Sequence, residues 1–538
     1  MTVTGLAGAL LLAACGTTAT AAPPAAGPSD SASPSALLPA PKAPIGPLLD
    51  EEDVARAVDQ LDGFVGTAME RTGVPGIAVA VVYKDKVIFR KGYGVRKVGA
   101  PEKIDPGTVF QVASVSKPVA STIVAGVVSE GKASWSDPVR TWNPKFTFSD
   151  PYVSEHATLG DLLSHRSGLP GVAGDELEDL GWSRDHIQNV LRYQPLAPFR
   201  DTYDYSNFGF TAGGIAAADA KGQSWEDLAD SMLFRPLGMQ ESSYSHAAYE
   251  GRDNKALIHV PVGPAADKKW TAKWVRNADA EAPAGGLSTS VDDLAKWLRL
   301  QLGNGTFEGQ QLVDSADLQV THLPHADSRP ATVPGERTQF YGLGWNVTDD
   351  DNGRVQLSHS GAFFLGAATS VQMLQTEQLG IITLTNGRPT GAAEAINNQF
   401  FDAAQHGTPT VDWLKFFGDV FEQIFAANDA QGAKWATPPA DAKPPQANSV
   451  YEGTYHNSYY GPLQVAERNG SLVMTMGPPA EPVTFALAPF DGDTFTFQTI
   501  GETAAGRSGA AFTVGSDGKA SVNLAFYDTT GLGTFERT

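Results

Sequence analysis

The sequence predicts a mixed α/β domain followed by a small all-β domain, on three observations. Residues 110–130 form a short extended run and then an almost unbroken apolar segment, too short to cross a bilayer, which predicts a helix buried inside a globular domain. Residues 76–94 predict a β-hairpin, with β-rich runs on both sides of Lys84-Asp85-Lys86. From Tyr451 the chain changes to short strands separated by turns such as Asn469-Gly470.

The larger domain is expected over residues 49–408, with helical and strand patterns alternating along the chain. Residues 409–448 predict an amphipathic helix and an Ala/Pro-rich linker, and residues 449–538 the all-β domain. The expected elements of the larger domain are a helix near 49–70, the hairpin at 76–94, the buried helix from Ser114 to Gly131, a short helix that runs into a Gly/Pro loop over 158–170, a loop and small-residue helix at 201–217, a Gly-Gly turn, Ser/Thr cap and amphipathic helix over 283–302, strands at 341–347, 355–361 and 379–385, and a helix at 392–405.

The N-terminus carries an apolar run followed by the single cysteine of the chain. Residues 5–14, GLAGALLLAA, precede Cys15, and Leu12-Ala13-Ala14-Cys15 resembles a bacterial lipobox. The resemblance implies a signal peptide over 1–14, lipidation of Cys15 and a disordered tether over 15–48, hence an exported lipoprotein of the cell envelope, on the periplasmic side or the outer surface. The alternatives are an ordinary signal peptide that ends near a cysteine and a misread N-terminus. Residues 1–4 contain no Lys or Arg, which departs from the usual positively charged start of a signal peptide.

Composition excludes several classes of function. The formal net charge is −21, from 60 acidic and 39 basic residues, which argues against nucleic-acid binding and against electrostatic docking on anionic lipid. We therefore expect contact with a membrane only through the N-terminal anchor. One cysteine allows neither an internal disulfide nor a thiolate zinc cluster, and no cofactor or metal is predicted.

Ser114 and Lys117 are the first candidate catalytic pair. They lie three residues apart at the start of the buried helix, so the lysine amine comes within reach of the serine hydroxyl. Desolvation lowers the pKa of a buried lysine until the neutral amine can accept a proton, which activates a serine without histidine. The same Ser-x-x-Lys spacing at Ser129 and Ser516 falls in polar, glycine-containing stretches and predicts turns.

Two further groups follow in order, Tyr205-Ser206-Asn207 and His359-Ser360-Gly361. Together with Ser114-x-x-Lys117 they resemble the three-motif signature of the β-lactamase and penicillin-binding protein family of serine hydrolases, in its branch of class C β-lactamases, D-Ala-D-Ala carboxypeptidases and esterases. The resemblance covers roughly residues 53–405. It implies a β-lactamase-like fold, an antiparallel sheet flanked by helices plus a helical subdomain, with the all-β tail as an appended barrel-like domain.

The resemblance implies a role for each matching position. Ser114 would be the acylated nucleophile, and Lys117 would act as its base or keep the surrounding proton network poised. Tyr205 would pass a proton to the leaving group, which requires a phenol pKa well below its usual value, and the nearby lysine could lower that pKa electrostatically. Asn207 would hold Lys117 and the substrate amide.

The third motif would bind the substrate. The amides of Ser114 and Ala362 would form the oxyanion hole, and Gly361 would leave room for the substrate along the strand. His359 stands where many relatives carry Lys, and because imidazole is mostly neutral at pH 7 it should hold a carboxylate more weakly. His165, a further tempting base, is interpreted as structural.

These observations predict a cell-envelope serine acyl hydrolase acting on a small-molecule or peptide substrate, which could be an ester, a peptide amide or a β-lactam. Esterase or peptidase activity is favoured over efficient β-lactam hydrolysis, since no feature specifies fast deacylation. A non-catalytic envelope protein that binds peptidoglycan peptides or a related ligand is the alternative. A Ser-His-Asp triad and zinc hydrolysis are disfavoured, because the chain has neither Gly-x-Ser-x-Gly nor His-Glu-x-x-His. The pattern does not indicate an oligomeric state.

Overall fold

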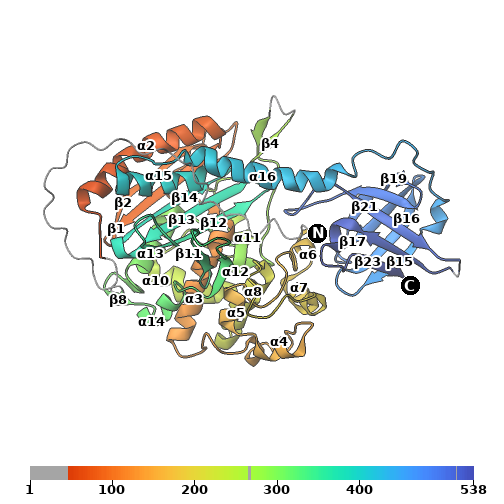
Figure 1. The fold of residues 1–538 in the computed structure, drawn as a ribbon, viewed down its shortest axis with the longest axis horizontal. Coiled ribbons are helices and arrows are strands. Elements are labelled where there is room, and N and C mark those ends of the chain that lie inside the picture. Colours follow the sequence, from red (N-terminus) through yellow and green to blue (C-terminus); the bar gives the residue numbers. More distant parts are fainter. Residues whose placement is uncertain (1–45, 264–267, 517) are drawn as a thin grey trace.

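The computed structural model describes residues 46–263, 268–516 and 518–538 (Figure 1). The predicted signal peptide, Cys15 and the predicted tether up to residue 45 lie outside the described residues. Within the described ranges, no helix combines the length and apolar character that crossing a membrane requires.

The larger domain is built on an antiparallel sheet with the strand order β2-β1-β14-β13-β12-β11-β10-β9. The hairpin of β1 and β2 turns at Lys84 and Asp85, which both have positive φ, as a tight turn between twisted strands requires. The strands are β1 Gly76–Tyr83, β2 Lys86–Gly94, β9 Ala326–Arg329, β10 Gln339–Tyr341, β11 Asn346–Asp349, β12 Val355–Phe363, β13 Ala367–Leu374 and β14 Leu379–Thr385.

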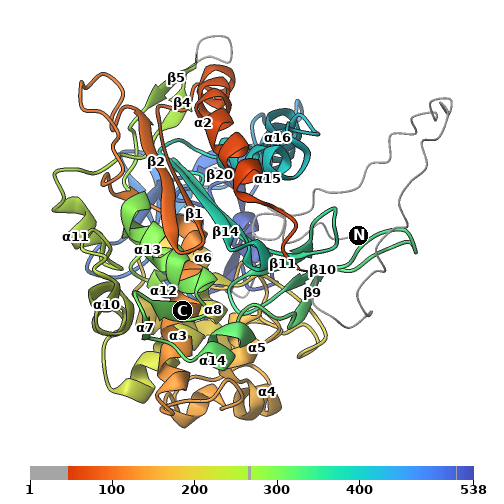
Figure 2. The same ribbon diagram turned by 90° about the vertical axis from the view of Figure 1, so that its left-hand side faces the viewer.

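Helices cover both faces of this sheet. On one face lie α2 Glu51–Thr72 and α15 Ala392–His406, and on the other α13 Val291–Leu302 and α3 Ser116–Ser129 (Figure 2). Alternate side chains of β1 point to opposite faces of the sheet. Ile77, Val79 and Val81 pack with α2 and α15. Ala78, Ala80 and Val82 belong to the core around α3. Both faces of β1 are therefore apolar.

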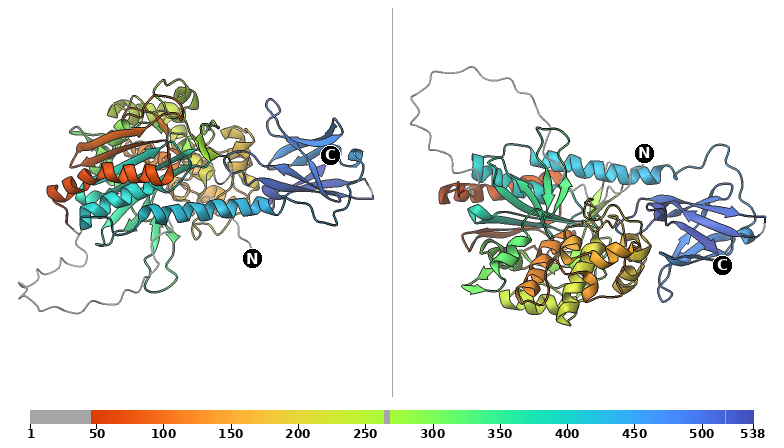
Figure 3. Two further views of the ribbon diagram at one scale, coloured as in Figure 1. Left: turned by 90° about the horizontal axis from the view of Figure 1, so that it is seen from above. Right: turned by 60° about the horizontal axis from the view of Figure 1, so that its bottom comes forward.

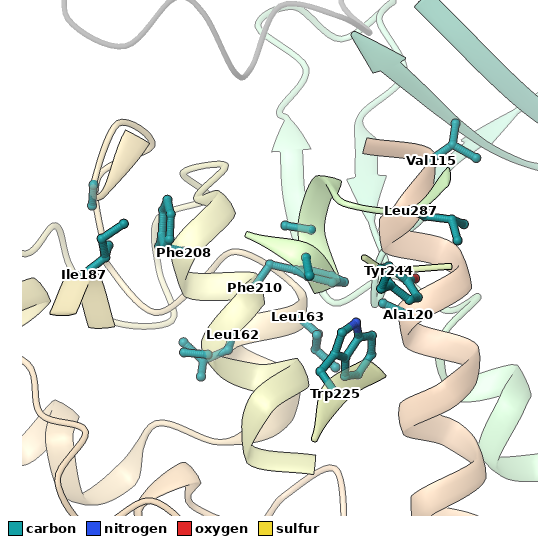
Figure 4. Packing of buried hydrophobic residues seen from close by; sticks show 14 of the residues in the cluster. Val115, Ala120, Leu162, Leu163, Ile187, Phe208, Phe210, Trp225, Tyr244 and Leu287 are labelled. Carbon is teal, nitrogen blue, oxygen red and sulfur yellow. The ribbon is translucent and has the colours of Figure 1, made fainter. Parts of the chain in front are cut away.

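A helical subdomain packs around α3. The apolar faces of α5 and α8 meet that of α3, and Figure 4 shows Leu162, Leu163 and Phe210 lying between these helices. Thr158 closes a capping box on α5, and Ser206 caps α8 through Gly209 N. The helices are α4 Pro151–His156, α5 Leu159–Leu163, α6 Asp175–Asp179, α7 Arg184–Val190, α8 Asn207–Lys221, α9 Trp225–Ala229, α10 Arg235–Leu237, α11 His246–Glu250, α12 Ala282–Gly285 and α14 Ser315–Val320. Short two-stranded pairs complete the domain: β3 Phe110–Gln111 with β6 Ser288–Thr289, β4 Val260–Val262 with β5 Lys269–Thr271, and β7 Thr306–Phe307 with β8 Gln310–Gln311.

The long helix α16, Trp413–Ala433, leads from the larger domain to the C-terminal domain (Figure 3). The strand order there is β18-β17-β16-β15-β23-β22-β21-β20-β19, a nearly closed, barrel-like all-β sheet, so the predicted fold class is confirmed for both parts of the chain. Asn469 and Gly470 both have positive φ at the predicted turn. The strands are β15 Gly453–Asn457, β16 Gly461–Arg468, β17 Ser471–Met476, β18 Val483–Ala486, β19 Ala488–Asp491, β20 Thr494–Gln498, β21 Arg507–Val514, β22 Ala520–Leu524 and β23 Thr534–Arg537.

The barrel contacts the helical subdomain at α6. Tyr459 Oη accepts a hydrogen bond from Gly174 N at 2.7 Å. The Asp179 carboxylate accepts three, from Glu502 N at 2.8 Å, Thr503 N at 3.0 Å and Thr503 Oγ1 at 2.6 Å. The three bonds to Asp179 hold the loop between β20 and β21 against the larger domain, and the bond to Tyr459 holds the loop between β15 and β16.

The prediction of one continuous strand over 341–347 is wrong, because a turn interrupts it. β10 ends at Tyr341 and β11 begins at Asn346, and the chain turns between them at Gly344, where φ is +81°. A Cβ at Gly344 would lie 2.5 Å from Ser121 Oγ and 2.8 Å from Lys117 O, so glycine lets this turn press against α3.

A buried ion cluster ties the start of α2 to the sheet and generates the first prediction. Arg354 and Glu377 are fully buried and paired, and Glu377 also accepts hydrogen bonds from Leu48 N and Leu49 N.

Glu377→Ala should lower the free energy of unfolding by about 3–5 kcal/mol, because it leaves a buried guanidinium with one carboxylate partner fewer. Chemical denaturation measures this. The control Glu70→Ala, at an exposed position of α2, should change stability by less than about 0.5 kcal/mol; equal losses in the two variants would contradict the prediction.

Candidate active site

Ser114 lies in a tight turn that leads into α3. Residues 113–115 form one turn of 3₁₀ helix, and α3 follows directly from Ser116, with Pro118 in its first turn and Gly131 at positive φ just after its end. The predicted buried helix is confirmed, with its α-helical start two residues later than expected. Ala113 has φ +47°, a strained value for a residue with a side chain. The turn leaves Ser114 partly exposed while its neighbours are buried.

Lys117 is completely buried beneath the Ser114 hydroxyl. Its Nζ lies 3.1 Å from Ser114 Oγ, 2.8 Å from Asn207 Oδ1 and 3.0 Å from Ala284 O. Burial lowers the pKa of Lys117 to about 7, although Glu281 and Asp175 partly oppose that shift. A neutral amine has two N–H groups and one lone pair. Asn207 and Ala284 can accept the two N–H groups, which directs the lone pair at Ser114.

Tyr205 lies next to both Lys117 and Ser114. Lys117 Nζ is 4.5 Å from the centroid of the Tyr205 ring, and the phenol forms a hydrogen bond with Ser114. The expectation of a lowered phenol pKa is wrong. Burial raises the pKa of Tyr205 well above its usual value, and this outweighs the bond to Ser114. The phenol therefore stays protonated and can act as a hydrogen-bond or proton donor.

His359 lies close to this group but its two nitrogens are already engaged. Nε2 accepts a hydrogen bond from Tyr341 Oη at 2.9 Å, and Nδ1 donates to Ser360 O at 2.8 Å. Burial, and secondly the charge of Lys117, lower the pKa of His359 to about 3. In this arrangement His359 offers a substrate neither a positive charge nor a free nitrogen.

Close packing between β12 and the turn before Ser114 requires glycine at position 361. A Cβ there would lie 2.1 Å from Val112 O, 2.4 Å from Thr369 Oγ1 and 3.1 Å from Ser114 N. Its lack of a side chain brings β12 against the nucleophile turn, whereas the sequence suggested that it makes room for a substrate. Ala362, the next residue, lines a cavity with Ser114 and Asn207.

His165 supports the second motif. Its Nδ1 accepts a hydrogen bond from Ser206 N at 3.1 Å, and its ring centroid is 4.4 Å from that of Tyr205. Burial holds the pKa of His165 well below its usual value, so the ring is neutral. These contacts agree with the structural interpretation of His165.

The cavity beside Ser114 also contains charged residues that the sequence reasoning missed. Its volume is about 60 Å³, and its walls include Asp175, Glu178, Glu281 and Arg276 from the larger domain and Glu502 from the barrel. The acidic run Asp175-Glu176-Leu177-Glu178-Asp179 was a visible signal, but Arg276 and Glu502 are distant in sequence. Within the described ranges, no group of three or more His, Cys, Asp or Glu side chains is arranged to hold a metal ion.

Comparison with known proteins agrees with this geometry. The family model described as "Beta-lactamase" matches residues 61–405, and a "Domain of unknown function (DUF3471)" matches residues 437–529. The chain is 25% identical over 493 residues to the unguisins hydrolase ungD' of Aspergillus campestris, covering 88% of each protein.

Two further likenesses are more distant. Protein flp of Staphylococcus aureus (strain COL) is 23% identical over 338 residues, which cover 61% of this chain and 62% of protein flp. The structure of the octameric penicillin-binding protein homologue from Pyrococcus abyssi shares the fold, with a TM-score of 0.55 and 19% identity over 89% of this chain and 100% of that one. The family match spans more than half of the chain, and on that ground the chain belongs to the β-lactamase family of serine hydrolases.

Proposed function

We propose that the protein is a serine acyl hydrolase that forms an acyl-enzyme on Ser114, with ester or peptide amide substrates favoured over efficient β-lactam hydrolysis. One observation carries the proposal: a buried lysine amine, with a pKa of about 7, lies 3.1 Å from the Ser114 hydroxyl. The family match supports hydrolase chemistry at the coarser level.

Each side chain has a task that its environment suits. The neutral Lys117 amine takes the Ser114 proton as Oγ attacks the substrate carbonyl. Asn207 keeps the amine aligned through the 2.8 Å bond. The Tyr205 phenol passes its proton to the leaving group and regains one from the Lys117 ammonium, so that both residues return to their starting protonation states, and the amides of Ser114 and Ala362 stabilise the oxyanion. Water then hydrolyses the acyl-enzyme by the reverse proton path.

The charge around the nucleophile supports an ester or peptide substrate over a penicillin. Penicillins carry a carboxylate close to the scissile bond. Four carboxyl groups and one guanidinium line the cavity, and His359 supplies no positive charge. The Arg276 guanidinium in the cavity wall is already paired with Glu178 and Glu281, so it is not free to bind that carboxylate.

A non-catalytic binding protein is the second candidate, and the first prediction of this subsection separates the two. A fluorophosphonate should label the wild type at Ser114, as located by mass spectrometry, and Ser114→Ala should lose both this label and the hydrolysis of a small ester. Ser129→Ala, which removes the serine of a chance Ser-x-x-Lys, is the matched control and should keep both. Binding without turnover in the wild type supports the binding protein, and turnover that survives Ser114→Ala refutes the proposed mechanism.

The second prediction concerns pH. An exposed lysine with a pKa near 10.4 is neutral in only about one molecule in 2500 at pH 7, whereas the pKa of Lys117 is about 7. Since acylation requires the neutral amine, kcat/KM should rise with pH through about 7 and then level off, as a pre-steady-state burst or initial rates can measure.

Lys117→Arg provides the control for this profile. Arginine keeps its proton throughout the accessible pH range, so acylation should fall by at least about 10²-fold at every pH, while the melting temperature reports whether the variant folds. A wild-type profile that is flat between pH 5.5 and 9 would exclude Lys117 as the base.

A further inference from the structure

The cavity beside Ser114 is enclosed by carboxyl groups from separate parts of the chain. Asp175 and Glu178 come from α6, Glu281 from the residue before α12, and Glu502 from the barrel loop. Arg276 is the one permanently charged basic residue among those that line the cavity in the described chain. The barrel thus contributes a charged group to the site of the proposed chemistry.

Arg276 pairs with only two of these four carboxyl groups. Its Nη2 donates to Glu178 Oε2 at 2.5 Å and to Glu281 Oε1 at 2.8 Å, and its Nη1 donates to Asn277 O. Glu502 accepts hydrogen bonds from the backbone N–H groups of Phe364 and Leu365, which are uncharged donors. The carboxyl groups therefore outnumber the cations that compensate them.

One carboxylate oxygen in this cluster has no partner within the described residues. The Glu178 side chain is 7% exposed and lines the cavity, and its Oε1 makes no hydrogen bond. Asp175 Oδ1 receives only a long bond of 3.4 Å from Asn207 Nδ2. Burying a carboxyl oxygen without a hydrogen-bond donor costs free energy, because the oxygen loses its contact with water. A ligand that supplies an N–H donor to this oxygen would remove that cost.

The protonation of the cluster points in the same direction. Burial raises the pKa of Glu178 to about 8, and it raises that of Asp175 well above its usual value, with Glu281 adding to the effect. Burial likewise raises the pKa of Glu502 to about 7. A cation bound in the cavity would lower these pKa values again, because it stabilises the ionised carboxylates.

We propose that this cavity binds a primary ammonium group of the substrate, so that the enzyme prefers acyl groups that carry a free amine next to the carbonyl attacked by Ser114. An ammonium has three N–H donors, which can reach carboxylates on different walls. With a volume of about 60 Å³, the cavity has room for a few heavy atoms only. This inference rests on the proposed function and specifies its substrate class.

The test compares two isosteric substrates, glycyl p-nitroanilide and propionyl p-nitroanilide, which differ by an ammonium in place of a methyl group. Rates are measured at pH 7 and low salt, with the rate of Ser114→Ala subtracted. A hydrogen-bonded charge pair contributes about 1.5–3 kcal/mol, so kcat/KM should be at least about tenfold higher for the glycyl substrate.

Variants locate the effect in the cavity. Glu178→Gln should reduce the glycyl-to-propionyl ratio by about tenfold, and its melting temperature shows whether it folds. Glu481→Gln, an exposed carboxylate on the barrel, is the matched control and should leave the ratio unchanged. A ratio near one in the wild type, or the same ratio in wild type and Glu178→Gln, overturns the inference.

A binding readout covers the case in which neither anilide is cleaved. Glycinamide should slow fluorophosphonate labelling of Ser114 at concentrations where propionamide does not. Equal protection by the two amides overturns the ammonium site while the proposed function stands. If Ser114 is not labelled at all, the proposed function itself fails, and the inference that rests on it fails too.

Discussion

Burial of the Lys117 amine is the constraint on which the rest of the site depends. A charged ammonium in this position would lose its hydration. Among the described residues, its partners within hydrogen-bond distance are all neutral: a hydroxyl, a side-chain amide and a backbone carbonyl. The nearest carboxyl groups act at longer range and moderate the shift. A lysine that is half neutral at physiological pH follows from this balance.

The fold maintains that balance by close backbone approaches. Glycine at 361 lets β12 contact the turn before Ser114, and glycine at 344 lets the β10–β11 turn press on α3. Both approaches bring other segments close to the backbone at residues 112–117, where Lys117 is fully buried. The Phe210 ring of α8, which belongs to the apolar cluster in Figure 4, has its centroid 5.8 Å from Lys117 Nζ. The sheet and the helical subdomain together bury the Lys117 amine.

The C-terminal barrel contributes to the site as well as to the architecture. Asp179 of α6 binds the backbone of the loop that carries Glu502, and Glu502 in turn accepts N–H groups that follow β12. The barrel loop is therefore linked at once to the acidic helix and to the end of the active-site strand. A change in how the barrel packs against the larger domain would move the Glu502 carboxyl group relative to Ser114. The C-terminal domain can therefore influence which substrates the site binds.

Local pattern alone determined much of this protein. The apolar run after Ser114, the hairpin at Lys84-Asp85 and the turn at Asn469-Gly470 were predictable because burial and turn geometry depend on neighbouring residues. The three ordered motifs also identified Ser114, Lys117, Tyr205 and Asn207 as neighbours in space. Their proximity follows from the family resemblance, since sequence spacing by itself does not bring residues 90 positions apart into contact.

Only the tertiary structure decided the electrostatics. The raised pKa of Tyr205, the engaged nitrogens of His359 and the reason for Gly361 all depend on burial and on atoms far away in sequence. The same holds for the carboxyl cluster, which joins residues 175–178 to Glu281 and to Glu502. Desolvation and charge interactions act through space over a few ångströms, and a linear pattern of residues does not contain those distances.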